Sequence, residues 1–367
     1  MKTTNLVWQS VLDTFRRTKT INPVAFRAIG SFACLTLTYL FYMIDEVYGE
    51  LAASLPVGLS GLDSAKGTKD IKVSLPGSPP RPAPPGLIHQ YEPHPLSRLR
   101  AQAALTQETL EVADRLEQLT SIEQLGDGCC QQPVAASALW MGNLQDVRKS
   151  IVDNLLVTKD ANRVARCEAE GFRVVPTREI INIGIVNGAG STGSGAMVAD
   201  GMITKLEAFH RGFSVINHNF VLLPSAGAAV NAHAARANAG KYLLESALAY
   251  EHPELIRVHT LDNQTLRFTE APIVDTVTPV SVGSQFLAAA DRSELAARLA
   301  VLFLTLITSP LLAVSEEHFA DSKGAQGDRR HGLPFLRRIG QARGWIHSDR
   351  NISLGKAAVA SRFANDI

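Results

Sequence analysis

The segment that decides the fold is Glu179-Ile-Ile-Asn-Ile-Gly-Ile-Val186, followed directly by Asn187-Gly-Ala-Gly-Ser-Thr-Gly-Ser-Gly195. The first part is apolar and rich in β-branched residues, which is typical of a strand buried on both faces of a parallel sheet. The second part leads into the helical periodicity of residues 196–210. A glycine turn between a strand and a helix presents backbone N–H groups at the positive end of the helix dipole, and predicts a phosphate-binding loop. The alternative is a tight turn whose glycines serve packing alone.

Strand-like and helical patterns alternate on both sides of this segment. The expected strands cover residues 24–29, 55–62, 179–186, 213–223 and 272–282. The expected helices cover residues 31–47, 96–125, 135–156, 196–210, 231–250 and 291–308. Because strands that alternate with helices form parallel sheets covered on both faces, we expect an α/β fold with a doubly wound, mostly parallel sheet. Residues 76–86 are rich in proline, which lacks the ladder donor, and are expected to form a surface loop.

Composition and charge exclude several classes of protein. Lys and Arg number 36 against 35 Asp and Glu, so the formal net charge of +1 gives no global field that would attract nucleic acid or anionic lipid. The basic stretch of residues 329–350 is interpreted as a solvated face rather than as a nucleic-acid surface. The four cysteines have neither C-x-x-C nor zinc-finger spacing. They predict reduced thiols, a cytoplasmic location and no metal site built on cysteine.

Residues 28–44 form a nearly uncharged stretch that is either a buried core helix or a membrane span. About 17 apolar residues is the lower limit for crossing a bilayer. The stretch also contains Gly30 and Ser31, and a second apolar run, residues 299–314, is interrupted by Pro310. The core-helix interpretation is therefore favoured for both segments, and a membrane partner is not expected.

Of two common phosphate-binding motifs, the glycine loop lacks one and contains part of the other. A Walker A loop needs Lys and then Ser or Thr after its last glycine, whereas Ala196 and Met197 follow here, so this motif is excluded. The dinucleotide fingerprint G-x-G-x-x-G is present from Gly188 to Gly193. It lacks the acidic residue expected at the tip of the next strand, where the chain has Pro224 and Ser225.

The string Gly190-Ser-Thr-Gly-Ser-Gly195 resembles the signature loop of the tubulin/FtsZ superfamily. The neighbouring segments agree with this resemblance: Phe220-Val-Leu-Leu-Pro224 is similar to the strand that follows, and residues 231–239 are similar to the Asn-containing helix of prokaryotic tubulin-like domain proteins. The resemblance implies binding of GTP or GDP with Mg²⁺, and head-to-tail association with further copies of the chain. It also implies GTP hydrolysis at the contact between subunits and leaves room for an adaptor protein.

The same resemblance implies an arrangement of domains and of site residues. A nucleotide-binding domain would cover residues 1–290, a central core helix residues 291–314, and a partial second domain or C-terminal extension residues 315–367. The implied catalytic residues lie in an acidic loop after the central helix, and are Glu316, Glu317 and Asp321. The implied nucleotide contacts are Gly30, Ser31, Asp63, Gly188, Ala189, Gly190, Ser191, Thr192, Gly193, Ser194, Gly195, Asn231, Arg236, Asn238 and Asp275.

Two alternatives stay open. Phe32 stands where the family has small residues in its first phosphate loop, which favours a tubulin-like scaffold that neither binds nor hydrolyses nucleotide. A protein of another class, an oxidoreductase dependent on NAD or NADP, would use the same glycine loop as a dinucleotide site.

Overall fold

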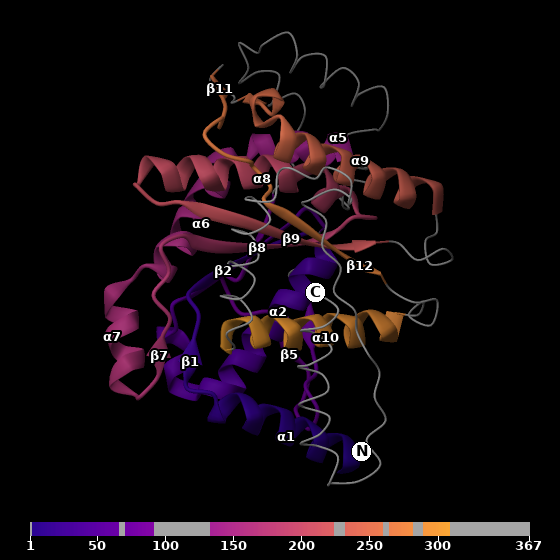
Figure 1. Ribbon diagram of the computed structural model, residues 1–367. Coiled ribbons are helices and arrows are strands. Elements are labelled where there is room, and N and C mark those ends of the chain that lie inside the picture. Colours follow the sequence, from indigo (N-terminus) through magenta and orange to yellow (C-terminus); the bar gives the residue numbers. More distant parts are fainter. Residues whose placement is uncertain are drawn as a thin grey trace, which may run out of the picture.

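A six-stranded parallel sheet forms the centre of the molecule (Figure 1). The computed structural model describes residues 2–65, 70–91, 133–223, 232–259, 264–281 and 289–308. The strand order is β12-β9-β8-β2-β3-β6, and every neighbouring pair is parallel. The strands are β2 (Val24–Ile29), β3 (Val57–Asp63), β6 (Ile88–Gln90), β8 (Ile180–Asn187), β9 (Val215–Leu223) and β12 (Thr276–Ser281).

Helices cover both faces of this sheet, as the sequence predicts for a doubly wound α/β fold (Figure 1). One face carries α1 (Lys2–Arg17), α2 (Ser31–Tyr48) and α10 (Ala289–Thr308). The other face carries α5 (Pro133–Gly142), α6 (Leu144–Thr158), α8 (Ser191–His210) and α9 (Ala232–Glu251). The prediction of the fold class is confirmed.

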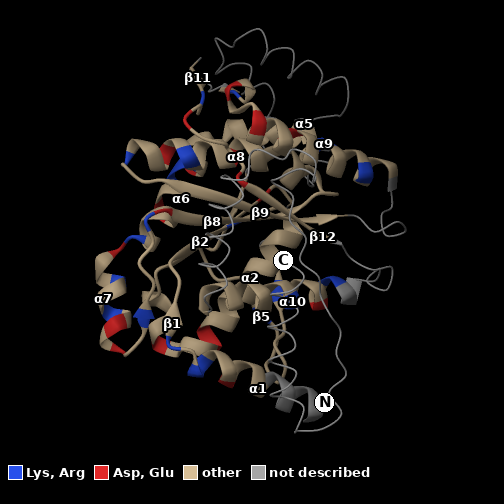
Figure 2. Ribbon diagram, in the orientation of Figure 1, with Lys and Arg blue, Asp and Glu red and all other residues tan. Residues whose placement is uncertain are grey.

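Smaller elements lie around this core. They are α7 (Ala161–Ala169), the 3-10 helices η1 (Gly49–Ser54) and η4 (Pro253–Leu255), and three two-stranded sheets. The sheets pair β1 (Thr20–Ile21) with β7 (Arg173–Val174), β4 (Lys72–Val73) with β5 (Arg81–Pro82), and β10 (Val258–His259) with β11 (Thr265–Leu266). Charged residues of both signs lie on outer helices such as α1 and α7, and few lie on the central strands (Figure 2).

Aromatic packing holds α10 against the sheet. Phe303 of α10 lies between Phe26 of β2 and Phe220 of β9, with ring centroids 5.5 and 5.1 Å apart. All three side chains are buried. The helix also packs along α2, so α10 belongs to the hydrophobic core. Residues 309–314 of the expected central helix lie outside the described residues.

Most expected elements are present, with shifted ends. The strand expected at residues 24–29 is β2, and the helix expected at residues 135–156 is divided at Asn143 into α5 and α6. The strand expected at residues 272–282 begins only at Thr276. The helix expected at residues 96–125 lies outside the described residues.

The apolar helix α2 is an element of the core. Eleven of its residues are buried. Within the described part of the chain, no helix combines the length and apolar character that a membrane crossing requires.

The order of the strands reverses at the centre of the sheet. The chain runs outward from β2 through β3 to β6 on one side, and from β8 through β9 to β12 on the other. Numbered along the chain, the six strands therefore lie in the order 3-2-1-4-5-6. In such sheets, ligands bind at the carboxyl ends of the strands where the order reverses, and here that point lies between β2 and β8.

Candidate functional site

Two helix N-termini meet at the point where the strand order reverses. Helix α2 begins at Ser31 after Gly30, and α8 begins at Ser191 after Gly190. Because both N-cap residues are glycines, neither supplies a side-chain capping bond, and neither first turn contains an acidic residue. The backbone N–H groups of both first turns therefore contribute positive partial charge at one place.

The two turns are in direct contact. Gly30 has a φ of 97°, a conformation that favours glycine. A Cβ placed on Gly30 would lie 3.7 Å from the backbone nitrogen of Gly193 and 3.8 Å from the Cβ of Thr192. The structure thus brings the first loop and the start of α8 together.

The loop between β8 and α8 consists of residues 188–190 only, because the helix already begins at Ser191. Strand β8 ends at Asn187, whose side-chain oxygen accepts a hydrogen bond from the N–H of Ala189 at 3.1 Å. The N–H of Gly190 donates to the carbonyl oxygen of Asn187 at 3.0 Å, which closes a tight turn. The helix then starts at Ser191, and the hydroxyl of Ser194 donates to the carbonyl oxygen of Gly190 at 2.5 Å. Residues 191–195 therefore form the first turns of α8.

Packing accounts for two of the glycines that the resemblance implies as nucleotide contacts. A Cβ on Gly193 would lie 2.4 Å from Cγ2 of Val186 and 3.0 Å from the carbonyl oxygen of Ile29. A Cβ on Gly195 would lie 2.2 Å from the carbonyl oxygen of Pro133, in α5. Both glycines let α8 approach its neighbours closely. The partly exposed backbone of the turn lies at Ala189 and Gly190.

A third strand contributes a carboxylate to the same edge. Asp63 ends β3 and is 1% exposed. Its carboxylate accepts hydrogen bonds from the hydroxyl of Ser31 at 2.5 Å and from the backbone N–H of Ser64 at 2.8 Å. The hydroxyl of Ser64 lies 2.9 Å from that of Thr192 on α8. Side chains from β3, α2 and α8 are thereby joined in one hydrogen-bonded chain.

Helix α9 approaches the turn from a further side. The side-chain amide of Asn238 donates to the carbonyl oxygen of Ala189 at 3.3 Å. The ammonium of Lys241 donates to the carbonyl oxygen of Ser194 at 3.3 Å and pairs with Glu245 at 2.5 Å. Sequence reasoning missed Lys241, although its position three residues after Asn238 places both on one side of a helix.

Several expected site residues are not brought to this edge. Asp275 precedes β12 at the amino end of the sheet, where it pairs with Lys205 at 2.7 Å and accepts from the N–H of Asn217 at 2.7 Å. The end of β8 is level with Leu222 of β9. Leu222 is five residues after Asn217, so Asp275 lies about 17 Å from that edge of the sheet, at about 3.3 Å per residue. Arg236 is exposed on α9. Asn231, Glu316, Glu317 and Asp321 lie outside the described residues.

Two side chains in the first turn of α2 pack inward. Phe32, which the sequence places where a phosphate loop would have a small residue, is partly buried against the hydrophobic core. Cys34 is fully buried, and burial raises the pKa of its thiol, with the nearby Asp63 carboxylate adding to the rise. The neutral thiol therefore adds no negative charge at the N-terminus of α2, where Asp63 supplies the nearby carboxylate.

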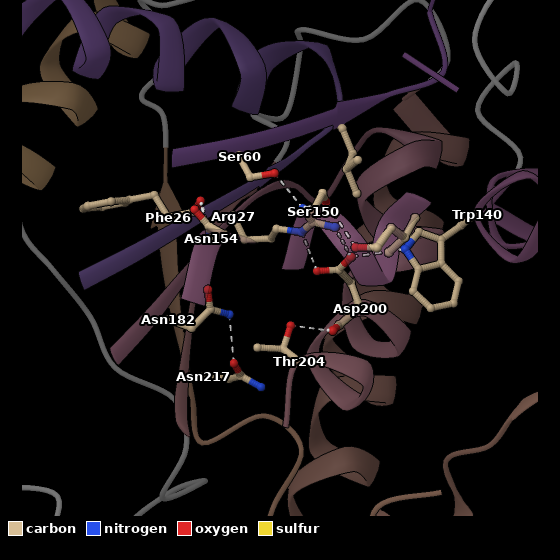
Figure 3. Close-up of polar contacts among 12 residues, drawn as sticks. Phe26, Arg27, Ser60, Trp140, Ser150, Asn154, Asn182, Asp200, Thr204 and Asn217 are labelled. Carbon is tan, nitrogen blue, oxygen red and sulfur yellow. Dashed lines mark hydrogen bonds and ion pairs between the residues drawn. The ribbon is translucent and has the colours of Figure 1, made fainter. Parts of the chain in front are cut away.

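A buried ion pair lies beneath the site (Figure 3). Arg27 of β2 and Asp200 of α8 are each 1% exposed, and the guanidinium donates to both carboxylate oxygens at 2.8 and 2.9 Å. The same guanidinium donates to the hydroxyls of Ser60 and Ser150, at 2.7 and 2.6 Å. The indole N–H of Trp140 donates to Asp200 at 3.2 Å. Arg27 lies three residues before Gly30, so this cluster fixes α8 to the strand that ends at the site.

In the described part of the chain, no group of three or more His, Cys, Asp or Glu side chains could hold a metal ion by itself. Asp63 and the hydroxyls of Ser31, Ser64 and Thr192 are nevertheless oxygen donors, the type of ligand that Mg²⁺ prefers. A magnesium ion that also binds phosphate needs one or two protein carboxylates. The donors present fit that requirement.

No family model matches the chain, and no curated protein matches it. Among solved structures, the chain is similar to CetZ2 from Haloferax volcanii, described as a GTPγS-bound protofilament. The alignment has 14% sequence identity and a TM-score of 0.38, and it covers 78% of this chain and 59% of that one. Because this TM-score is too low to support an assignment, the fold class rests on the sheet topology of the chain itself.

Proposed function

We propose that this chain binds the phosphates of a guanine nucleotide where β2 and β8 end, and that it associates head to tail with further copies of itself in the cytoplasm. The observation that supports the proposal is the meeting of two glycine-capped helix N-termini at the reversal of the strand order. Helix N-termini of this kind bind anions, and sheets with this strand order bind nucleotides at that point.

In this proposal the N–H groups in the first turn of α8 and the partly exposed turn at Ala189 and Gly190 face the phosphates, and Gly30 and Ser31 approach them from α2. Asp63, with the hydroxyls of Ser31 and Thr192, would hold Mg²⁺, which neutralises charge on the phosphates when it is bound. Asn238 would hold the turn and Lys241 the start of α8, because they donate to the carbonyl oxygens of Ala189 and Ser194, respectively. The resemblance of Gly190–Gly195 to the tubulin signature loop favours guanine nucleotide over other phosphate ligands.

Hydrolysis forms a separate part of the proposal. Glu316, Glu317 and Asp321 would orient a water molecule against the terminal phosphate bound to the neighbouring subunit. A head-to-tail contact is heterologous, so it generates a filament when the rotation between subunits does not close a ring. Phosphate release that rises more than linearly with protein concentration would be the kinetic sign of a site completed by two copies.

A dinucleotide is the second candidate ligand. The strand order 3-2-1-4-5-6 is shared by dinucleotide-binding folds, and Gly188, Gly190 and Gly193 match their fingerprint. The strand after the glycine turn, β9, ends in Leu222 and Leu223, which cannot hold a ribose hydroxyl. The guanine nucleotide is therefore the first choice.

The test places one negative charge at the turn. Ala189→Asp and Ala189→Asn add side chains of equal size, so only the charge differs between them. Two unit charges about 5 Å apart repel by about 3 kcal/mol at an effective dielectric constant of about 20, which predicts about 100-fold weaker binding for the Asp variant relative to Asn.

Calorimetric titration of both variants and of the unchanged chain with GTP–Mg²⁺, NAD and NADP measures this difference. Equal affinity of the two variants for GTP would place the nucleotide elsewhere. Binding of NAD or NADP alone would replace the proposal with the oxidoreductase, and no binding to the unchanged chain would support the degenerate scaffold. Light scattering after addition of GTP–Mg²⁺ then tests self-association.

A further inference from the structure

The proline-rich segment 79–85, Pro-Pro-Arg-Pro-Ala-Pro-Pro, is held in an extended conformation on the surface beside α2. Proline fixes its own φ near about −65° and pushes the preceding residue toward the β and polyproline II regions. From Pro79 to Pro84, every residue is a proline or precedes one. The chemistry of the sequence therefore restricts this run to extended backbone of the β or polyproline II type before any tertiary contact forms, and Arg81–Pro82 pairs with β4 in the structure.

Two matching turns fix the ends of this run. The N–H of Ser78 donates to the carbonyl oxygen of Leu75 at 3.0 Å, and the N–H of Leu87 donates to that of Pro84 at 3.2 Å. Each turn has Pro-Gly at its centre, and the glycines, Gly77 and Gly86, have φ values of 86° and 80°. Proline followed by a glycine of positive φ is the pattern of a type II turn.

One edge of the run is anchored to the protein. The Arg81 guanidinium donates to Oε1 of Glu46 at 3.0 Å and lies 5.2 Å from the centre of the Tyr42 ring. The Tyr42 hydroxyl donates to the carbonyl oxygen of Pro82 at 2.6 Å, and the N–H of Ala83 donates to that of Ile71 at 2.9 Å. Arg81 is therefore occupied within the molecule.

One set of residues three apart is exposed along the whole run: Pro79, Pro82 and Pro85. Pro80 is exposed as well, whereas Arg81, Ala83 and Pro84 are partly buried. A polyproline II helix has three residues per turn, so residues at this spacing share one edge. The protein thus presents one proline edge to solvent and packs another against itself.

We propose that the edge formed by Pro79, Pro82 and Pro85 is a docking site for a protein module with an aromatic-lined groove that reads polyproline II ligands. Such modules gain affinity from a ligand that is already in the bound conformation, and the two turns and the Arg81 anchor supply that order here. Addition of a strand from another chain is disfavoured, because prolines remove the backbone donors that it needs. Since Arg81 pairs with Glu46, the module must recognise proline rings without an arginine.

The experiment compares the full chain with a free peptide of residues 75–88 as ligands for three immobilised probes, an SH3, a WW and an EVH1 domain. We expect at least one domain to bind both ligands, and to bind the full chain at least as tightly as the peptide. Binding of the peptide but not of the full chain would overturn the proposal, because the proline edge would then be inaccessible in the folded protein. Absence of binding to all three domains by either ligand would overturn it as well.

Matched variants locate the contact. Pro79→Ala, on the outward edge, should weaken binding about tenfold, because it removes ring atoms that a groove would bury. Pro84→Ala, on the inward edge, should change the affinity less than threefold. Circular dichroism and the urea midpoint establish that both variants remain folded. Equal losses of affinity in the two variants would contradict the assignment of the edges.

Discussion

Replacement of Gly193 by alanine tests whether this glycine serves packing or a ligand. The new Cβ would lie 2.4 Å from Cγ2 of Val186, 3.0 Å from the carbonyl oxygen of Ile29 and 3.3 Å from that of Asn187. The valine methyl can rotate away, but the two carbonyl oxygens belong to the strands β2 and β8 and cannot. Helix α8 must therefore move away from the sheet.

The expected loss of stability follows from two opposing effects. Overpacking of a tight core costs about 3 kcal/mol at the upper end, and alanine regains about 1 kcal/mol over glycine through helix propensity. The free energy of unfolding should fall by about 2 kcal/mol without any ligand present. At a urea slope of about 3 kcal/mol per molar, the midpoint should fall by about 0.7 M.

Gly240 on α9 supplies the matched control. A Cβ on Gly240 meets nothing within 4 Å, so Gly240→Ala should raise the midpoint by about 0.3 M through propensity alone. Urea unfolding followed by circular dichroism measures both variants in buffer without nucleotide. A midpoint for Gly193→Ala at or above that of the unchanged chain would refute the packing argument and return Gly193 to a role in ligand binding.

Further predictions concern the buried polar and titratable groups. Arg27→Met should lower the free energy of unfolding by about 3–5 kcal/mol, because Asp200 would be left as an unpaired buried charge, and adding Asp200→Leu should recover most of the loss in a double-mutant cycle. Tyr91 and Tyr242 are buried and their pKa values are raised by desolvation, so both stay neutral in the folded chain and ionise on unfolding above about pH 10. These two tyrosines alone should lower the free energy of unfolding by about 3 kcal/mol per pH unit above about pH 10, and stability is fully present below it. Full tyrosinate absorbance at 295 nm in the folded chain at about pH 10 would contradict this. The raised pKa of Cys34 predicts no reaction of its thiol with a disulfide reagent at pH 8 until the chain unfolds, which a stopped-flow absorbance trace measures.

The fold was predictable because local patterns decide it. The apolar run of β2 and the β-branched run of β8 are continuous in sequence, and strands buried on both faces need only such runs. Sequence could not show that Arg27, within the apolar run of β2, is buried. Its partner Asp200 lies 173 residues further along the chain, and only the packing of α8 on the sheet brings the two together.

The candidate site was predictable in part, for a related reason. A strand, a glycine turn and a helix identify a helix N-terminus with open backbone N–H groups at the end of the strand. The contact of Gly30 with Thr192 and Gly193 lies at such a place. The pattern does not show which glycines meet a neighbouring backbone, as Gly193 and Gly195 do. Asp275 was expected at the site only because the resemblance implies it. Strand β12 begins at Thr276, so this carboxylate lies at the amino edge of the sheet.

The Arg27–Asp200 pair bears on how the site keeps its geometry. A fully buried ion pair seldom stabilises a fold more than apolar residues of the same volume would, because desolvation offsets the attraction. Its bidentate geometry does, however, fix the rotation of α8 about its axis and its position along β2. Both Asp200 carboxylate oxygens lie within 2.9 Å of guanidinium nitrogens of Arg27. The Gly30 and Gly190 turns lie at the ends of these two elements. A site made from two helix N-termini depends on their relative position, so a directional contact beneath it serves the site in a way that apolar packing would not.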